Sequence, residues 1–160
     1  MKNNSFHTSS AYADRLIIKK NSSSGWQLTS GTPSAGAPYN DFAFTVNNNG
    51  AETTAGSDSG VAVTGTWFHV VGVWDGTSVI KLYVNGTLQS SAGTSGYGLG
   101  SLSNLYIGER TDGYAAYDGS IDDVRFYNRA LSSADVTELY NYTGASGGGG
   151  TPESYFISFQ

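Results

Sequence analysis

Residues 67–86 read WFHVVGVWDGTSVIKLYVNG, and this stretch decides the fold. Residues 67–74 are apolar on both alternating faces, which is typical of a strand covered on both sides. Asp75-Gly76 and Asn85-Gly86 each close an apolar run, and both dipeptides suit the positive φ angles of a type I′ turn. The pattern therefore predicts a three-stranded antiparallel meander from Trp67 to Ser91.

Shorter apolar runs outside this stretch predict further strands, at 15–20, 25–30, 41–46 and 155–159. Residues 47–60 are polar and rich in Gly and Thr, so they are predicted to be a loop. From Ser132 the period changes to that of a helix. Ser132 and Asp135 form a capping-box-like start, and one helical face then carries Val136, Leu139 and Tyr140. One short helix is therefore predicted at 132–140.

The composition indicates a single all-β domain. The 160 residues include 22 Gly, 13% aromatic and only 13% charged residues, against a usual charged share of roughly 25%. The net charge is −5 and the longest basic run is Lys19-Lys20, so no cationic surface for nucleic acid is expected. No apolar run approaches the roughly 20 residues of a membrane-spanning helix, so membrane insertion is not expected. The absence of Cys excludes disulfides and thiolate metal sites.

Composition also divides the chain into four parts. Residues 1–14 are a polar N-terminal arm, and residues 15–143 carry the sandwich pattern. Residues 144–151 are a Gly-rich linker, and residues 152–160 are a strand-like C-terminal segment. The first twenty residues lack the apolar region of a signal peptide, so none is expected in this chain.

Three motifs carry a resemblance to a known family. They are Trp67-x-His-Val leading to Asp75-Gly76, Leu82-Tyr-Val-Asn-Gly86, and Gly119-Ser-Ile-Asp-Asp-Val-Arg-Phe-Tyr-Asn-Arg-Ala-Leu131. Across residues 15–141 the chain resembles the laminin-G-like branch of the concanavalin A-like lectin/glucanase superfamily. The resemblance implies a two-sheet antiparallel jelly-roll sandwich with one short C-terminal helix. Members are mostly non-catalytic modules of secreted, cell-surface and phage proteins, and they bind glycans or proteins or serve as spacers.

The chain departs from the family at its beginning. The family's opening strands, with a Phe-Asp-Gly-like turn and a Trp-Val pair, have no counterpart here. An incomplete sandwich exposes a strand edge, which invites pairing. The segment Tyr155–Phe159 could fill the gap from its own chain, or from a neighbour by strand exchange, which would make a homo-oligomer. The alternative is that residues 3–13 supply a strand without a recognisable pattern.

Acidic residues form the candidate metal site: Glu109, Asp112, Asp118, Asp122 and Asp123. Ca²⁺ takes about six to eight oxygen ligands, which loops between strands can supply. The resemblance implies one structural calcium ion near the strand that begins Ile121-Asp122, with Asp122, Asp118 and Glu109 as its ligands. Because Asp122 shares a strand face with Val124 and Phe126, its carboxylate is expected to point toward the core. A buried carboxylate needs partners, and the alternative partners are backbone amides, Arg125 or Arg129.

Aromatic rings in polar loops are the candidate sugar platforms, because a ring face stacks on a pyranose while polar neighbours bond its hydroxyl groups. The candidate ligand-binding residues are Tyr114, Tyr117, Tyr97, Asp112, Trp26 and Tyr39, and Tyr106 is a further ring. Tyr114 and Tyr117 come first because they lie on the loop 111–119. Packing in the core or at its rim is the alternative for every one of these rings. His69 lies between buried neighbours and is expected to be a core histidine.

Catalysis finds no support in the sequence. The superfamily's glucanases carry Glu-x-Asp-x-x-Glu, whose carboxylates act as nucleophile and acid, and that spacing is absent. The chain is therefore expected to be a non-enzymatic, lectin-like carbohydrate-binding or adhesion module on an extracellular, cell or virion surface. Its partner would be a glycan or a cell-surface or capsid protein. The alternative is a structural or assembly subunit, such as a phage capsid decoration, a tail-fibre module or a filament module.

Overall fold

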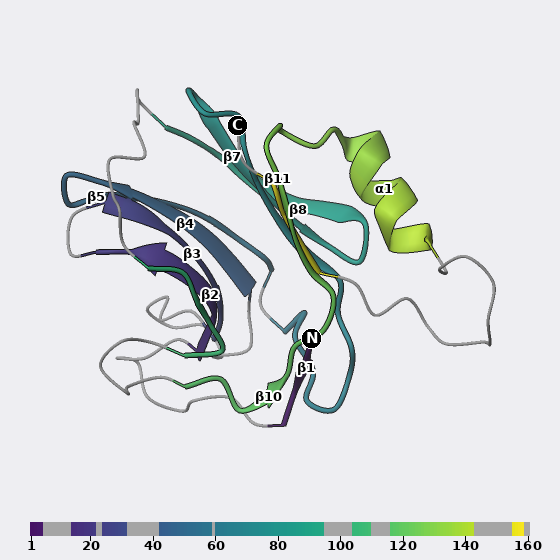
Figure 1. Ribbon diagram of the computed structural model, residues 1–160. Coiled ribbons are helices and arrows are strands. Elements are labelled where there is room, and N and C mark those ends of the chain that lie inside the picture. The colour runs from purple at the N-terminus through teal and green to yellow at the C-terminus, as the bar shows by residue number, and fades with distance from the viewer. Residues whose placement is uncertain are drawn as a thin grey trace.

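The computed structural model describes residues 1–4, 14–21, 24–31, 42–58, 60–94, 104–109, 116–142 and 155–158. Two five-stranded sheets pack face to face, and one helix covers the outer side of the second sheet (Figure 1). This arrangement confirms the predicted all-β sandwich with a short helix near its C-terminal end. Among the described residues, no helix is both long and apolar enough to cross a membrane.

The first sheet is antiparallel throughout. Its order is β5 (Ala51–Gly56), β4 (Phe42–Asn48), β3 (Ser24–Ser30), β2 (Asp14–Lys20) and β9 (Tyr106–Ile107). The three predicted strands at 15–20, 25–30 and 41–46 are confirmed. The predicted loop at 47–60 is wrong, because β5 lies within it. Asn49 and Gly50 have φ angles of 49° and 85°, so an Asn-Gly turn folds β5 back onto β4.

The second sheet contains the predicted meander. Its order is β11 (Val124–Tyr127), β12 (Tyr155–Ser158), β6 (Val70–Trp74), β7 (Val79–Val84) and β8 (Thr87–Gly93). The predicted type I′ turn between β7 and β8 is confirmed, since Asn85 and Gly86 have φ angles of 50° and 77°. β6 begins at Val70 rather than Trp67, because Trp67 forms an isolated bridge to Lys2 instead.

The turn between β6 and β7 differs from the predicted two-residue form. Four residues, 75–78, separate the two strands, and only Gly76 has a positive φ, of 81°. Asp75 Oδ1 accepts hydrogen bonds from the amides of Thr77, Ser78 and Val79 at 2.7–2.9 Å. The carboxylate thus organises the longer loop in the manner of an Asx turn.

β12 lies between β11 and β6 and is parallel to both. The chain leaves β11, passes through the helix α1 (Ser133–Asn141) and returns to the same sheet. β11, α1 and β12 therefore form a β-α-β crossover inside a sandwich that is otherwise antiparallel. The predicted C-terminal strand is present, and in this structure it enters its own chain's sheet.

A third, two-stranded sheet closes one end of the sandwich. It pairs β1 (Lys2–Asn3) with β10 (Gly119–Ser120). The Met1 side chain is buried in the core, and its amino group donates to the Phe68 carbonyl oxygen at 2.9 Å. The start of the predicted N-terminal arm is thus a strand, while residues 5–13 lie outside the described residues.

Two apolar layers lie on opposite sides of β6. Val70 and Trp74 face the layer between the two sheets, with Phe42 and Phe44 from the first sheet. Val71 and Val73 face the other way, beneath α1, with Tyr83, Leu131 and Val136. Gly72 lies directly against the Phe44 ring of the first sheet, because a Cβ at Gly72 would be 2.5 Å from Phe44 Cδ2. The helix is confirmed, with Ser132 as its N-cap and Asp135 completing the capping box.

Candidate functional site

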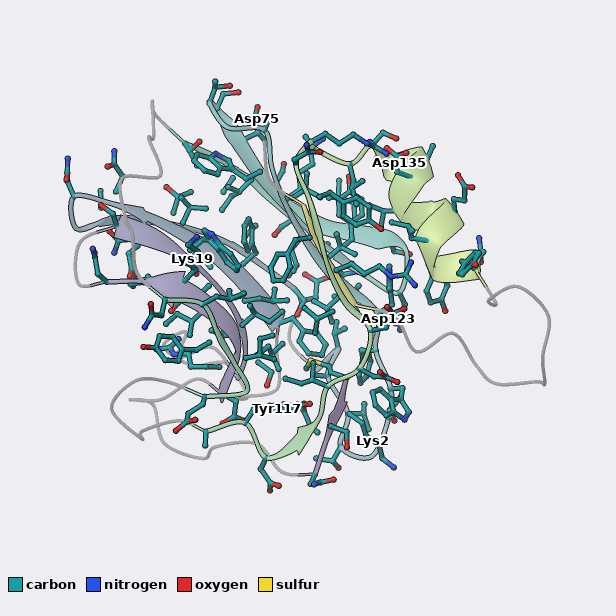
Figure 2. The ribbon with its side chains drawn as sticks, viewed as in Figure 1. Lys2, Lys19, Asp75, Tyr117, Asp123 and Asp135 are labelled. Carbon is teal, nitrogen blue, oxygen red and sulfur yellow. The ribbon has the colours of Figure 1, made fainter. Side chains whose placement is uncertain are left out.

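A pocket of about 280 Å³ lies between β11 and α1, on the outer side of the second sheet. It is lined by Arg125, Tyr127, Arg129, Leu131, Asp135, Glu138, Leu139 and Tyr142. β11 and the turn after it supply one wall, and the helix supplies the other. Figure 2 shows Asp123 and Asp135 toward opposite ends of this face.

Strand alternation explains which side chains of β11 reach the pocket. Phe126 lies on the side of the first sheet, with its ring centroid 6.2 Å from that of the core residue Trp26, although 44% of its surface stays exposed. Arg125 and Tyr127 occupy the alternate positions and therefore face α1. One polar and one aromatic side chain thus enter the pocket from four residues of strand.

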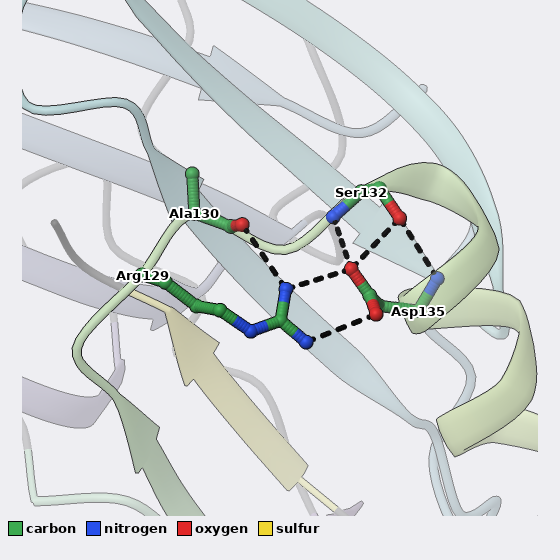
Figure 3. A network of polar contacts seen from close by, with 4 residues as sticks. All are labelled: Arg129, Ala130, Ser132 and Asp135. Atoms are coloured by element: carbon green, nitrogen blue, oxygen red, sulfur yellow. Dashed lines mark hydrogen bonds and ion pairs between the residues drawn. The ribbon is translucent and has the colours of Figure 1, made fainter.

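A charged network fixes the rim of the pocket where α1 begins (Figure 3). Arg129 donates two hydrogen bonds to Asp135, from Nη1 to Oδ2 at 2.8 Å and from Nη2 to Oδ1 at 3.0 Å. The Ser132 amide donates to Asp135 Oδ2 at 2.7 Å, and Ser132 Oγ accepts from the Asp135 amide at 3.1 Å. The hydrogen bonds from Arg129, and then those from Ser132, hold the pKa of Asp135 well below its usual range. Asp135 is therefore an ionised anchor.

The second arginine is held by a different carboxylate. Arg125 donates from Nε and Nη2 to the two carboxylate oxygens of Asp123, both at 2.8 Å. Such a bidentate pair fixes the orientation of the guanidinium. Both arginines of the pocket are thus positioned before any ligand arrives.

Both apolar and polar side chains line the pocket. Its arginines, Arg125 and Arg129, are matched in charge by Asp135 and Glu138. Tyr142 is 48% exposed, so part of its side chain is accessible. The volume lies near the lower limit for small-molecule sites. An uncharged ligand with an apolar face and several hydroxyl groups suits this combination best.

The predicted sugar platforms separate into two groups. Tyr114, Tyr97, Tyr39 and Asp112 lie outside the described residues. Trp26 is 3% exposed within the core, so its ring has no face available to a ligand. Tyr117 is half-buried against the core, and its hydroxyl donates to Asn3 Oδ1. Burial raises the pKa of Tyr117 above its usual value, which fits a packing role near β1 and β10 (Figure 2).

The expectation that Asp122 points toward the core is wrong. Asp122 is exposed just before β11, and its Oδ1 accepts a hydrogen bond from the Asp123 amide at 2.8 Å. Asp123 has a φ of 49°, so the chain turns there and the strand alternation begins only at Val124. Arg125 pairs with Asp123 and Arg129 with Asp135, so the structure shows neither arginine bonded to Asp122.

The other predicted calcium ligands are also at the surface. Asp118 Oδ1 accepts from Asn4 Nδ2 at 3.2 Å, and Glu109 is exposed. Over the described ranges, no three His, Asp or Glu side chains gather closely enough to hold a metal ion. Because Asp112 lies outside those ranges, the calcium site stays a prediction.

His69 is a core residue, as predicted. It is 2% exposed, and its ring centroid lies 5.7 Å from that of Tyr140 on α1. Burial lowers the pKa of His69 to about 4, so the imidazole is neutral at physiological pH. The ring therefore belongs to the apolar layer under the helix.

Sequence reasoning missed the pocket between β11 and α1. It used Arg125 and Arg129 only as partners for Asp122, and it used Asp135 only as a cap. The alternation of Val124 and Phe126 with Arg125 and Tyr127 was the available signal. It places the polar pair on the side of the sheet that the predicted helix must also cover.

The two packed sheets define a jelly-roll class of β protein. The family model of the concanavalin A-like lectin/glucanases superfamily matches residues 6–137. The chain therefore belongs to this superfamily, whose fold often binds carbohydrate. No curated protein matches the sequence.

Two solved structures are similar to the chain. The native heptameric SAP-like pentraxin from Limulus polyphemus has a TM-score of 0.59 at 15% identity, over 83% of this chain and 65% of that one. An S-layer domain-containing protein (residues 221–444) from Clostridium thermocellum has a TM-score of 0.45 at 23% identity, over 81% of this chain and 64% of that one. The chain thus spans less than two thirds of either solved chain. The pentraxin likeness supports the jelly-roll fold.

Proposed function

We propose that this protein is a non-catalytic carbohydrate-binding module of an extracellular, cell or virion surface, and that the pocket between β11 and α1 holds one sugar residue. The observation that supports this is the combination of two tyrosines, Tyr127 and Tyr142, with arginines already oriented by carboxylates. The superfamily's frequent carbohydrate binding supports the choice of ligand class.

The chemistry of the pocket suits a neutral pyranose. A tyrosine ring covers the apolar face of a sugar and loses little side-chain entropy on binding. Glu138 supplies carboxylate acceptors for hydroxyl groups, and the guanidinium groups of Arg125 and Arg129 line the same pocket. Because Asp123 and Asp135 already hold the two guanidinium groups, binding needs little further ordering of side chains.

A hydrolytic role is disfavoured by the carboxylates of the pocket. Glycoside hydrolysis needs one carboxyl group with a raised pKa, which protonates the leaving oxygen. Asp135 has the opposite shift, because Arg129 and Ser132 stabilise its charged form. Glu138 follows it by three residues on the same helix, so no second wall carries an opposing carboxylate in the described part of the pocket.

The test is a glycan-array screen of the full chain, run once with Ca²⁺ and once with EDTA. Binding is expected in both buffers, and Tyr142→Ala or Glu138→Gln should reduce it at least tenfold. Leu88→Ala is the matched control, because Leu88 is 46% exposed on β8, outside the pocket lining.

Three outcomes count against parts of this proposal. Binding that survives both pocket substitutions moves the site elsewhere, with Tyr114 and Tyr97 as the next candidates. Binding that is lost in EDTA points to calcium and to Asp112, Asp118, Asp122 and Glu109. No binding in either buffer removes the carbohydrate function.

A further inference from the structure

We infer that the slot between β6 and β11 can also receive β12 from a second copy of this chain, so that two copies exchange their C-terminal strands. In the structure the slot holds the chain's own β12, which pairs with a strand on each side. The same register can be satisfied from another copy, because main-chain groups of the three strands make the ladders.

The slot requires an occupant. β6 pairs with β7 on one side and with β12 on the other, while β11 has β12 as its sheet neighbour. Without β12, both strands would present unpaired amides and carbonyls in the middle of the second sheet. Such edges are ready templates for another extended segment.

The connection to β12 is much longer than its path requires. Tyr140 on α1 packs on His69, and Phe156 of β12 pairs with Val71, two residues further along the same strand. By strand spacing, the end of the helix and the start of β12 are therefore roughly 15–20 Å apart. A chain segment of this length, residues 143–154, could span at most about 40 Å if it were fully extended.

That reach permits exchange between copies. A 160-residue domain has a radius of gyration of about 15 Å, so an extended 40 Å connection can leave one copy and enter the next. The sequence of this connection includes four consecutive glycines, residues 147–150, and glycine has the widest range of allowed backbone angles. Reciprocal exchange fills both slots and closes a two-fold dimer.

Concentration sets the balance between the two arrangements. A strand that is tethered through about a dozen residues has an effective concentration on the order of millimolar at its own slot. The chain's own β12 therefore dominates in dilute protein. Exchange becomes comparable only near millimolar protein, and only after the strand has been released.

Cysteine cross-linking tests the exchange directly, because the chain contains no cysteine of its own. Ser158 pairs with Val73 across the β12–β6 ladder. Full-length Val73→Cys and full-length Ser158→Cys are mixed, unfolded in urea, refolded together and then oxidised. A disulfide between the two different chains forms only if β12 of one copy enters the slot of the other.

The expected result depends on concentration. The covalent dimer should account for on the order of a third of the chains at 1 mM and for a few per cent at 10 µM. Lys81→Cys mixed with Ser158→Cys is the matched control. Lys81 pairs with Val73 on the side away from β12, so it lies roughly 10 Å from Ser158, beyond disulfide reach. Tyr127→Cys with Ser158→Cys repeats the test across the β11 ladder.

The single chain with both substitutions, Val73→Cys and Ser158→Cys, shows whether the pair can react at all. If this chain closes on itself and neither mixture forms dimers at 1 mM, the exchange is refuted. If no disulfide forms within this single chain, β12 does not occupy the slot in this register. The premise of the exchange is then wrong. Neither result tests sugar binding in the pocket, which the glycan-array screen measures independently.

Discussion

The two sheets of this sandwich are built in different ways. Four of the five strands of the first sheet, β2 to β5, follow one another along the chain, and each pairs antiparallel with the next. The second sheet holds the meander β6–β7–β8, but β12 completes it from a point more than 60 residues beyond β8. Local turns therefore join four strands of the first sheet, and the remote strand β9 only adds to its edge. In the second sheet a remote strand lies in the middle.

This contrast shows which strand stabilises the fold most. A sheet of successive hairpins loses one ladder when one edge strand is damaged. The second sheet loses two ladders at once when β12 is removed, because that strand is central. The following variants test this difference, and they are ordered by the size of the expected effect.

Removal of β12 should have the largest effect. In a chain that lacks residues 152–160, the register pairs of β12 are lost, four with β11 and three with β6. At about 1 kcal/mol for each main-chain hydrogen bond, the free energy of unfolding should fall by roughly 4 kcal/mol or more. Urea unfolding measures this fall. Replacing residues 155–158 by four prolines, which have no amide N–H to donate, should give most of the same loss, and an unchanged midpoint in either chain would contradict the central role of β12.

Gly72→Ala should have the next largest effect. Its Cβ would overlap Phe44 of the facing sheet, with 2.5 Å to Cδ2, so the two sheets must separate locally. Overpacking of this kind costs about 1–3 kcal/mol. Gly56→Ala on β5 is the matched control, because its Cβ would meet only the Phe42 carbonyl oxygen at 3.8 Å. Thermal unfolding should show a lower midpoint for Gly72→Ala alone, and equal midpoints would mean that the sheets are not in close contact at β6.

His69 should make the second sheet sensitive to acid. Burial lowers its pKa from 6.5 to about 4, so between these values the unfolded chain binds more protons than the folded one. The contribution of neutral His69 to the free energy of unfolding is therefore fully present above pH 6.5, and it is lost as the pH falls toward 4. By pH 4.5 the loss should be about 2 kcal/mol. Urea unfolding of His69→Gln should show less dependence on pH between 7 and 4.5 than the parent chain, and equal slopes would contradict this assignment.

Asp75→Ala should have the smallest effect of the four. It removes an acceptor for three backbone amides in the β6–β7 loop, and loss of such a cap costs about 1 kcal/mol. Although desolvation works in the opposite direction, the hydrogen bonds from Val79, Ser78 and Thr77 hold the pKa of Asp75 well below its usual range. The loss should therefore be equal at pH 7 and pH 4.5, unlike the effect of His69. Asp58→Ala, in an exposed loop after the first sheet's β5, is the control.

Local chemistry made much of the fold predictable. Alternation and turn residues predicted the meander, three strands of the first sheet and the helix. The same rules also predict β5, because its Asn49-Gly50 turn is as strong a signal as Asn85-Gly86. That strand was missed because Ala51–Gly56 is polar and small on both faces, as suits an edge strand.

Partners distant in sequence were not predictable from pattern. Periodicity says which face a residue takes, but it does not say that Phe156 will lie beside Val71, 85 positions away. The pocket depended on the same kind of information. Arg129 and Asp135 are six residues apart and meet only because the chain turns between β11 and α1. Asp122 was misplaced because the positive φ of Asp123 interrupts the alternation just before the strand.

The place of β12 in the sheet also bears on the order of folding. The antiparallel ladders of β2 to β5 close over short sequence separations, which favours their early formation. The β12–β6 ladder joins residues 85 positions apart, so its loop-closure entropy is larger and its formation is expected late. Until then β6 and β11 remain open edges. The interval before the last strand docks is therefore when a folding chain is most exposed to association with its neighbours.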